Sequence, residues 1–428
     1  MPSWRDGARP AEEPTFEGQR TGRLDVQRLT SEPGMAGASA DWRSHLANSV
    51  LEHDWSAEME PVVNVLAREG RLGLAEGRLL YAHDDLAEVG LLAKLSREAR
   101  FGSRAFFNHN VHINPTNVCA LACRFCAFRR GKKADDAYAL DAEAYVNELN
   151  RFADHVTEVH TVGGLHPDWG IGHYEAMFRA AKEAHPHVTI KALTAVEIKH
   201  LASQSGLSIT ATLSRLFDAG LDQLPGGGAE ILDDGVREVI CKGKESSQEY
   251  LDIHEAVHAL GHVSNCTMLF GTVETTDHRL QHMLRLRDLQ DRTGGFQCFV
   301  PYPFLPDHSR LPEAQLATGT EVLRTMAVSR LVLDSIPHLK AYRMNIGDSL
   351  TELSLAFGAD DVDGTVQQES IMHLAGSSTP LDSDRRRLAR IIEDAGCEAW
   401  ERNSNYSEFT LLELPDPPAR RALHMAQG

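Results

Sequence analysis

Cys119-Ala-Leu-Ala-Cys123-Arg-Phe-Cys126 is the stretch of this sequence that decides the fold, because it sets three thiols within eight residues. Thiolates are the ligands that iron–sulfur clusters require, and three of them can bind three irons of a [4Fe–4S] cube. No fourth cysteine follows nearby to complete the set. The fourth iron would remain open to a small molecule, much as an open position marks a catalytic rather than a structural zinc site.

Two simpler interpretations compete with the cluster, namely an incomplete zinc site and chance. A zinc site needs a fourth ligand at a defined spacing, and the nearby His109 and His112 precede the thiols instead of following them. Chance is disfavoured because all three thiols share one turn-like stretch after a strand-like run. The other cysteines stand singly and are predicted to be buried thiols: Cys241, Cys266, Cys298 and Cys397.

Composition excludes several classes of partner. The chain has 428 residues with 61 acidic and 43 basic side chains, a net charge of −18. Nucleic acids and anionic membranes both favour basic surfaces, so neither is an expected partner. There is no apolar run of membrane-spanning length and no apolar segment at the N-terminus. An oxygen-sensitive cluster with free thiols points to a reducing cytoplasm.

The chain divides into four stretches by composition and periodicity. Residues 1–40 are rich in Pro, Gly, Arg, Glu and Ser and are predicted to form a disordered tail, with Met35 as a candidate start. Residues 41–103 have helical periodicity and predict a helical N-terminal extension. Residues 104–410 form the main domain, and residues 411–428 a C-terminal tail.

The main domain alternates strand-like and helix-like segments, which predicts an α/β fold, a TIM-type (β/α) barrel that is complete or partial. An incomplete six-stranded barrel is the main alternative, because the eighth strand is weak. The cysteine loop follows the first strand, on the rim where barrel active sites lie. The expected strands are Val111–Asn114, Glu158–Val162, Val188–Leu193, Asp222–Leu224, Val263–Phe270, Gln297–Pro301, Leu339–Met344 and Val362–Val366.

Further candidate residues follow other strands of this pattern. Gly163 and Gly164 end the second strand, where glycines let a ligand approach the backbone. The loop Pro225-Gly-Gly227-Gly-Ala-Glu230 offers a path for a nucleoside, with Glu230 as an acceptor for ribose hydroxyls. Cations in or after strands are expected to hold anionic substrate groups: Lys191, Lys340, Arg343 and His166. Period-two alternation predicts Lys340 on one strand face and Arg343 on the other.

His254-Glu255-Ala-Val-His258 matches H-E-x-x-H and raises a rival function, a zinc peptidase. The segment lies in the helix before a strand, which in a barrel belongs to the outer ring. No obvious third ligand follows it. We therefore expect a structural role for these histidines.

The cysteine spacing resembles that of the radical S-adenosylmethionine (SAM) superfamily. The resemblance implies a [4Fe–4S] cluster held by Cys119, Cys123 and Cys126, with SAM chelating the open iron and cleaved to a 5′-deoxyadenosyl radical. In that superfamily an aromatic residue such as Phe125 packs beside the adenine, and a Gly-Gly such as Gly163-Gly164 meets the amino group of SAM. The position after the glycines, usually Glu, is Leu165 here.

Further phrases resemble the aminofutalosine synthase family, among them His112–Asn117, Gly163–Pro167, Lys191–Glu197, Pro225–Glu230 and Pro337–Tyr342. The resemblance covers residues 104–407 and places Glu197 and Gly227 among the SAM-binding residues. It implies addition of the adenosyl radical to the enol ether of 3-[(1-carboxyvinyl)oxy]benzoate, then rearrangement and decarboxylation to aminofutalosine. A reductant such as flavodoxin or ferredoxin is also implied.

Two positions depart from that family. Leu305 stands where the family usually has His, and Arg343 where it usually has Trp. Both fall in segments expected at the substrate end of the barrel, so they leave the cofactors untouched and concern the acceptor. The alternatives are a paralogue with a different alkene or enol-ether acceptor, an enzyme that abstracts hydrogen, and a protein whose cluster only carries electrons or holds structure.

Overall fold

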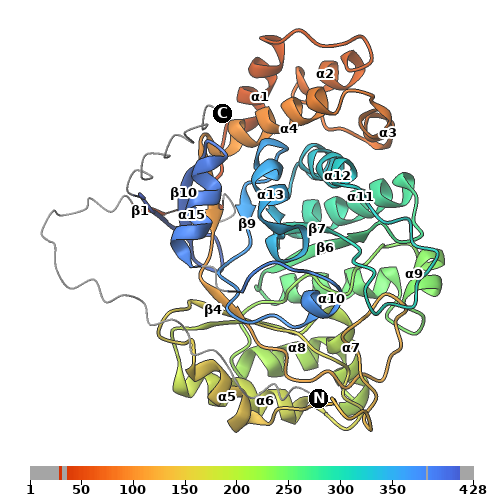
Figure 1. Cartoon of the computed structure of the whole chain (residues 1–428), viewed down its shortest axis with the longest axis vertical. Helices are drawn as coiled ribbons and strands as arrows, with labels where there is room; N and C mark the ends of the chain where they lie inside the picture. The colour runs from red at the N-terminus through yellow and green to blue at the C-terminus, as the bar shows by residue number, and fades with distance from the viewer. Residues whose placement is uncertain (1–27, 31–35, 382–383, 415–428) are drawn as a thin grey trace, which may run out of the picture.

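The computed structural model describes residues 28–30, 36–381 and 384–414. Parallel strands form a barrel at its centre, with helices around the outside (Figure 1). In the first half β3 (Asn110–His112), β4 (Glu158–Thr161) and β5 (Thr189–Ala192) pair in this order. The second half contains β6 (Ser264–Phe270), β7 (Phe296–Pro303), β8 (His338–Ala341) and β9 (Asp361–Val362).

Parallel bridges join the two halves on one side of the barrel, and hydrogen bonds of a side chain join them on the other. Gln223 bridges to Lys191 of β5 and Leu224 bridges to Ser264 of β6, so the predicted fourth strand is reduced to these two residues. On the other side β2 (Arg104–Phe107) pairs with β9 at Phe106 and Asp361. The Thr365 hydroxyl also bonds both the backbone N–H and C=O of Asn110. Of the predicted eighth strand, Val362–Val366, only Val362 lies in a strand, the two-residue β9. The TIM-type α/β fold is confirmed.

Helices connect successive strands and cover the barrel from outside (Figure 1). These are α5 (Ala142–Asn150), α6 (Ile171–Ala184), α7 (Ala195–Ser205), α8 (Ile209–Asp218), α9 (Asp234–Ile240), α10 (Ser247–Ala259), α11 (Thr276–Thr293) and α12 (Gly319–Val332). Helix α13 (Arg343–Ala356) and the short α14 (Ile371–Leu374) follow β8 and β9.

The prediction of a strand over Leu339–Met344 was wrong at its C-terminal end. The strand ends at Ala341, and the carbonyl of Tyr342 accepts hydrogen bonds from the amides of Asn345 and Ile346. Arg343 is therefore the first residue of α13 and does not lie on the opposite face of the strand from Lys340.

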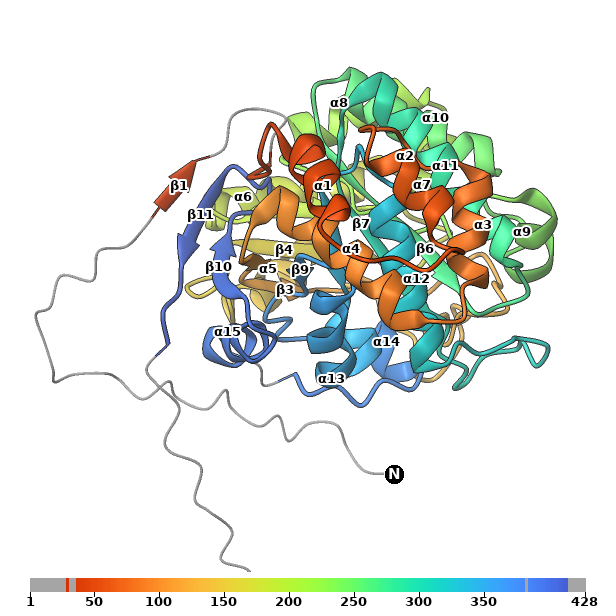
Figure 2. The same cartoon turned by 90° about the horizontal axis from the view of Figure 1, so that it is seen from above.

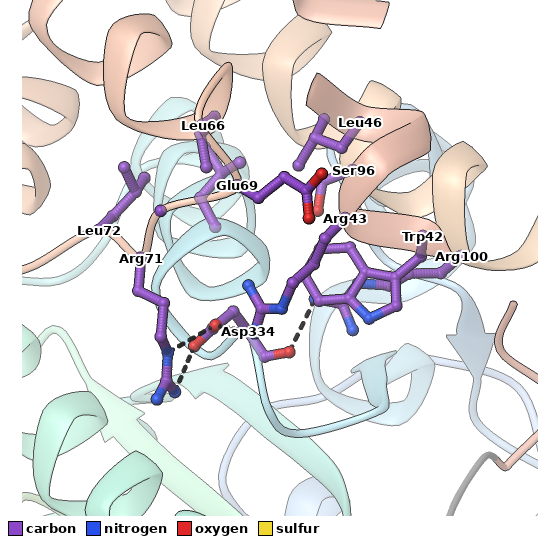
Figure 3. A pocket seen from close by; sticks show the side chains of 12 residues that line it. Trp42, Arg43, Leu46, Leu66, Glu69, Arg71, Leu72, Ser96, Arg100 and Asp334 are labelled. Carbon is purple, nitrogen blue, oxygen red and sulfur yellow. Dashed lines mark hydrogen bonds and ion pairs between the residues drawn. The ribbon is translucent and has the colours of Figure 1, made fainter. Parts of the chain in front are cut away.

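The N-terminal helices α1 (Trp42–Leu51), α2 (Glu60–Leu66), α3 (Leu74–Ala82) and α4 (Leu86–Phe101) lie against one side of the barrel (Figures 1 and 2). Helix α4 packs on α12 and α3 on α11. Asp334, in the loop before β8, accepts hydrogen bonds from Arg43 and Arg71 (Figure 3). The two N-terminal guanidinium groups thereby tie this extension to the barrel.

C-terminal elements cover the amino ends of the barrel strands. After α15 (Arg385–Asp394), β10 (Glu398–Arg402) pairs in parallel with β2, and β11 (Glu408–Leu411) pairs antiparallel with β10. Arg402 forms an ion pair with Asp361, and the Ser404 hydroxyl bonds the buried Glu158 carboxylate.

The predicted tails are described only in part. β1 (Arg28–Thr30) falls within the expected N-terminal tail and pairs with β11. The rest of the segment before residue 36, and the chain after residue 414, lie outside the described residues. Among the described helices, none has both the length and the apolar character needed to cross a bilayer.

Candidate active site

A cavity of about 310 Å³ lies inside the barrel. Alternate strand positions point into it, as the period-two geometry of strands requires: Asn110 and His112 from β3, Glu158 and His160 from β4, Lys191 from β5, and Lys340 from β8. Loops that follow the carboxyl ends of the strands line the rest of the cavity. The sequence therefore places the candidate site at the rim where (β/α) barrels bind their substrates.

The cysteine loop forms one wall of this cavity. Cys119, Cys123 and Cys126 all line it, and all three are free, partly exposed thiols. Burial raises the pKa of Cys123 to about 12 and also raises the pKa of Cys126. A metal centre reverses this preference, because a coordinating thiol is deprotonated outright.

The donor set fits a multi-iron cluster better than a single metal ion. Within the part of the chain that the structure describes, no three His, Cys, Asp or Glu side chains are grouped to hold one ion. In a [4Fe–4S] cube each thiolate binds a different iron, so the three thiols need not converge on one point. Three thiols facing a cavity, with no fourth cysteine in the loop, leave one iron for a ligand.

Main-chain hydrogen bonds fix the cysteine loop to its neighbours. The amide of Cys119 donates to the carbonyl of Arg130 at 3.1 Å, and the amide of Ala120 donates to the carbonyl of Leu165 at 2.9 Å. The amide of Arg124 donates to the carbonyl of Ile240 at 2.8 Å. Hydrogen bonds to neighbouring loops thus fix the position of the cysteine loop at the end of the barrel.

Gly164 packs directly against this loop, next to Gly163. A Cβ on Gly164 would lie 2.3 Å from the carbonyl oxygen of Val118 and 3.1 Å from the Cβ of Cys119. Only glycine allows so close a backbone approach. Gly164 is therefore required for packing against the cysteine loop, whereas Gly163 packs against Pro115 and Thr116 before the loop and lines the cavity.

The Glu197 carboxylate links the loops that follow β4 and β5 by hydrogen bonds. Its carboxylate accepts from the amide of Gly163 at 3.1 Å and from the amide and hydroxyl of Thr194 at 2.7 Å each, which caps α7. Burial raises the pKa of Glu197 to about 7. Glu197 lines the cavity, but its oxygens already orient the glycine loop.

The glycine loop after Leu224 faces the cysteine loop, and it contacts a residue that sequence reasoning missed. Gly227 and Glu230 line the cavity, but the Glu230 carboxylate forms an ion pair with Lys244, whose side chain is 8% exposed. The ammonium of Lys244 also lies 5.8 Å from the ring centroid of Phe125. Lys244 sits in an irregular segment before α10, so no periodicity could have revealed it.

Two predicted substrate cations reach the cavity. Lys191 forms a buried ion pair with Glu158 at 2.7 Å, so its charge is already matched. Lys340 lies 3.2 Å from Asp361, whose carboxylate is also paired with Arg402. Because Asp361 is shared by two cations, the positive charge of Lys340 is less fully neutralised than that of Lys191, and Lys340 is better able to attract an anionic group.

The other two predicted cations do not line the cavity. Arg343 is fully buried in α13 and pairs with Asp348 at 3.0 Å. His166 is half-buried and stacks on Trp169, with ring centroids 4.5 Å apart. Neither side chain is among those that line the cavity.

A histidine pair on the inner barrel wall also escaped the sequence prediction. Nε2 of His112 and Nδ1 of His160 are 3.2 Å apart and hydrogen-bonded, and both side chains line the cavity. Burial lowers the pKa of both imidazoles. The signal was available, because strands β3 and β4 carry polar residues at alternate positions.

The H-E-x-x-H histidines lie outside the barrel interior and are bonded to neighbouring side chains. Nδ1 of His254 and Nε2 of His258 both contact the Ser264 hydroxyl at 2.8 Å, and His258 also contacts Thr293. Glu255 is partly exposed and pairs with Arg292. These contacts join α10 to β6 and α11, which is the structural role expected from the sequence.

A closed parallel barrel whose first βα loop presents three thiols to the cavity defines a cluster-dependent enzyme of the radical SAM type. The family model of the radical SAM superfamily matches residues 113–286, and that of the CofH/MqnC C-terminal region matches residues 293–414. The chain belongs to the radical SAM superfamily, in the group that carries this C-terminal region. Its cofactors are accordingly a [4Fe–4S] cluster and SAM.

Curated relatives cover most of the chain. The aminodeoxyfutalosine synthase of Thermus thermophilus is 41% identical over 360 residues, which are 82% of this chain and 96% of that protein. That of Streptomyces coelicolor is 40% identical over 364 residues, or 82% and 94%. The cyclic dehypoxanthine futalosine synthase of the same organism is 34% identical over 377 residues, or 86% and 93%. The resemblance found in the sequence is confirmed.

Solved structures support the fold. The FeFe-hydrogenase maturase HydG from Carboxydothermus hydrogenoformans superposes with a TM-score of 0.64 at 18% identity, covering 85% of this chain and 84% of that one. Methylornithine synthase (PylB) gives 0.63 at 17% identity, with coverages of 82% and 96%. At these identities the likeness concerns the fold alone.

Proposed function

We propose that this enzyme joins the adenosyl group of SAM to the enol ether of 3-[(1-carboxyvinyl)oxy]benzoate, as an aminodeoxyfutalosine synthase. The observation that carries the proposal is the 41% identity along 96% of the Thermus thermophilus enzyme of that name. The CofH/MqnC region alone would not distinguish it from the related synthases, since it is named after other members of the group.

The cofactor end of the cavity is the wall formed by the cysteine loop and the two glycine loops. Cys119, Cys123 and Cys126 would hold the cluster, which together with bound SAM supplies a 5′-deoxyadenosyl radical. Gly163 would leave room for SAM next to the cluster, Gly164 lets the cysteine loop pack closely, and Phe125 would offer a ring to the adenine. Glu230, held by Lys244, and Gly227 lie on the side expected for the ribose.

The acceptor end is the wall formed by β7 and β8. Lys340 would attract a carboxylate of the acceptor, and His112 and Lys191 flank the same space. Tyr302 and Tyr342 lie with ring centroids 6.1 Å apart and offer flat apolar surface to an aromatic ring. Held in this way, the alkene could be kept within about 3–3.5 Å of the reacting carbon.

Apolar side chains close the cavity between these two ends. Leu269, Val300, Phe304, Leu305 and Met372 all line it. Such a wall excludes water, which protects a reactive radical from side reactions. A one-electron reductant such as flavodoxin or ferredoxin would be required to start each turnover.

Leu305 favours a second candidate, a paralogue that uses a different alkene or enol-ether acceptor. It lines the cavity at a position where the aminofutalosine synthase family usually has histidine. Arg343, the other departure, is turned away and paired with Asp348, so it does not alter the cavity wall. Of the two departures from the family, only Leu305 could therefore change which acceptor the cavity binds.

The experiment is an anaerobic assay of the reconstituted enzyme with SAM, dithionite and the enolpyruvyl-oxybenzoate, read by mass spectrometry. A product with the mass of aminodeoxyfutalosine supports the proposal. Formation of 5′-deoxyadenosine alone would show intact radical chemistry with the wrong acceptor, and the paralogue would then be preferred. Lys340→Met should raise the KM for the acceptor about tenfold or more, while SAM cleavage without acceptor stays unchanged.

A further inference from the structure

The outer side of the cysteine loop has an unusual charge for this protein. The whole chain carries a net charge of −18, but residues 119–133 contain five basic residues and no acidic residue. The basic residues are Arg124, Arg129, Arg130, Lys132 and Lys133. This is the segment that carries the three cluster thiols, so local positive charge is concentrated at the cluster.

Carboxylates from other segments neutralise only part of this charge. Arg124 pairs with Glu313, Arg130 with Asp136, and Lys132 with Asp168. Arg129 and Lys133 have no carboxylate partner among the described residues, and neither has the exposed Arg310 from the loop after β7. Three cations without a carboxylate partner therefore belong to this region: Arg129 and Arg310 contact the cysteine loop, and the exposed Lys133 follows it in the same segment.

Two of these cations contact the peptide groups of the cluster ligands themselves. Nη2 of Arg310 donates to the carbonyl of Ala122 at 2.7 Å and to that of Cys123 at 3.2 Å. Nε of Arg129 donates to the carbonyl of Cys119 at 3.4 Å. Ala120 and Ala122, between the ligands, are exposed. The loop that would hold the cluster is thus exposed at Ala120 and Ala122 and is contacted by Arg129 and Arg310. We call these four residues, together with the exposed Lys133 that follows them in the chain, the loop face.

We propose that the loop face is the docking site of an acidic one-electron carrier protein that reduces the cluster. One electron passes from the reduced carrier to the cluster, and the carrier leaves oxidised by one electron. The need for this electron comes from the chemistry of the superfamily, so the inference holds for any acceptor at the other end of the cavity.

The charge distribution gives this site its selectivity. An acidic carrier is repelled by the strongly negative molecule as a whole, so a local excess of cations both attracts it and orients it. The small side chains of Ala120 and Ala122 let a partner approach closely. Neighbouring Val239 is 38% exposed and adds an apolar contact, as the mixed character of protein interfaces requires.

The test measures SAM cleavage to 5′-deoxyadenosine in the holoenzyme without any acceptor. The electron comes either from a reduced acidic flavodoxin or from dithionite. Lys133 makes no hydrogen bond within the described part of the chain, so its substitution should leave the fold intact. At low salt we expect Lys133→Gln to slow the flavodoxin-supported rate about threefold, and Lys133→Glu about tenfold. Both losses should nearly vanish at about 1 M salt, where charges are screened beyond roughly 3 Å.

Two further variants make the result specific. Arg68→Glu changes the same charge at an exposed position between α2 and α3, and should leave both rates unchanged. Arg310→Lys keeps the charge and should retain most of the flavodoxin-supported rate, whereas Arg310→Gln should lose it. Equal rates for Lys133→Glu and the wild type with flavodoxin at low salt would overturn the proposal. So would a loss that is equally large with dithionite, because it would indicate damage to the cluster. A missing aminodeoxyfutalosine product would count only against the proposed function.

Discussion

Gly164→Ala should damage the cluster site far more than it damages the fold. The new methyl group would lie 2.3 Å from the carbonyl oxygen of Val118, 2.7 Å from its carbonyl carbon and 3.1 Å from the Cβ of Cys119. Carbon atoms at optimal contact are about 3.5–4.0 Å apart, so one of the two backbone segments must move by about 1 Å. Neither segment is the free end of a flexible side chain, and the cysteine loop is the one that would move.

The expected magnitudes follow from this displacement. Overpacking of this kind costs about 1–3 kcal/mol in the free energy of unfolding, which a chain of this size can tolerate. A shift of about 1 Å in a reacting group can lower a rate roughly 100-fold. We therefore expect a folded protein with less bound iron and a rate of SAM cleavage reduced about 100-fold.

Gly172→Ala is the matched control, because a Cβ at Gly172 in α6 would meet no atom within 4 Å beyond the adjacent backbone of its own helix. There the same substitution should be neutral, or stabilise the helix by about 0.5–1 kcal/mol. Iron and sulfide analysis, the visible absorbance of the cluster and the yield of 5′-deoxyadenosine measure the effect. A Gly164→Ala protein with full iron content and wild-type cleavage would refute the argument that the glycine positions Cys119.

Three other perturbations test separate parts of the structure. Glu197→Gln should change the pH dependence of stability: burial raises the pKa of Glu197 to about 7, so its stabilising contribution is complete below about pH 4.5 and lost as the pH rises past 7. The difference in unfolding free energy between wild type and variant should fall by up to about 3 kcal/mol from pH 4.5 to 8 in denaturant titrations, and a constant difference would contradict this. Asp334→Asn should lower the free energy of unfolding by about 2 kcal/mol, since Arg43 and Arg71 lose their shared carboxylate but remain partly solvated; an unchanged melting temperature would show that these ion pairs contribute nothing. Glu255→Gln should leave SAM cleavage and metal content unchanged, whereas a loss of activity with an intact cluster would revive the H-E-x-x-H interpretation.

The sequence predicted the fold because the barrel depends on local, repetitive patterns. Strand and helix periods alternate along the main domain, and the cysteine spacing marks the first βα loop. The errors occurred where local signals are weakest. The strand expected at Asp222–Leu224 forms only two bridges, and the strand expected to include Arg343 stops at Ala341 because the carbonyl of Tyr342 begins a helical turn.

The residues proposed for the cofactor end of the site could be predicted from the sequence alone, since Cys119–Cys126 and Gly163-Gly164 each lie within one short segment. Which cations remain available to an anionic substrate was decided only by tertiary structure, because the role of a cation depends on its partners. Lys191 and Lys340 look alike in the sequence. In the structure the charge of Lys191 is matched by Glu158, whereas Lys340 must share the carboxylate of Asp361 with Arg402. Lys244 likewise acquires its place beside Phe125 through folding, because a charge in a loop has no period that predicts what it will face.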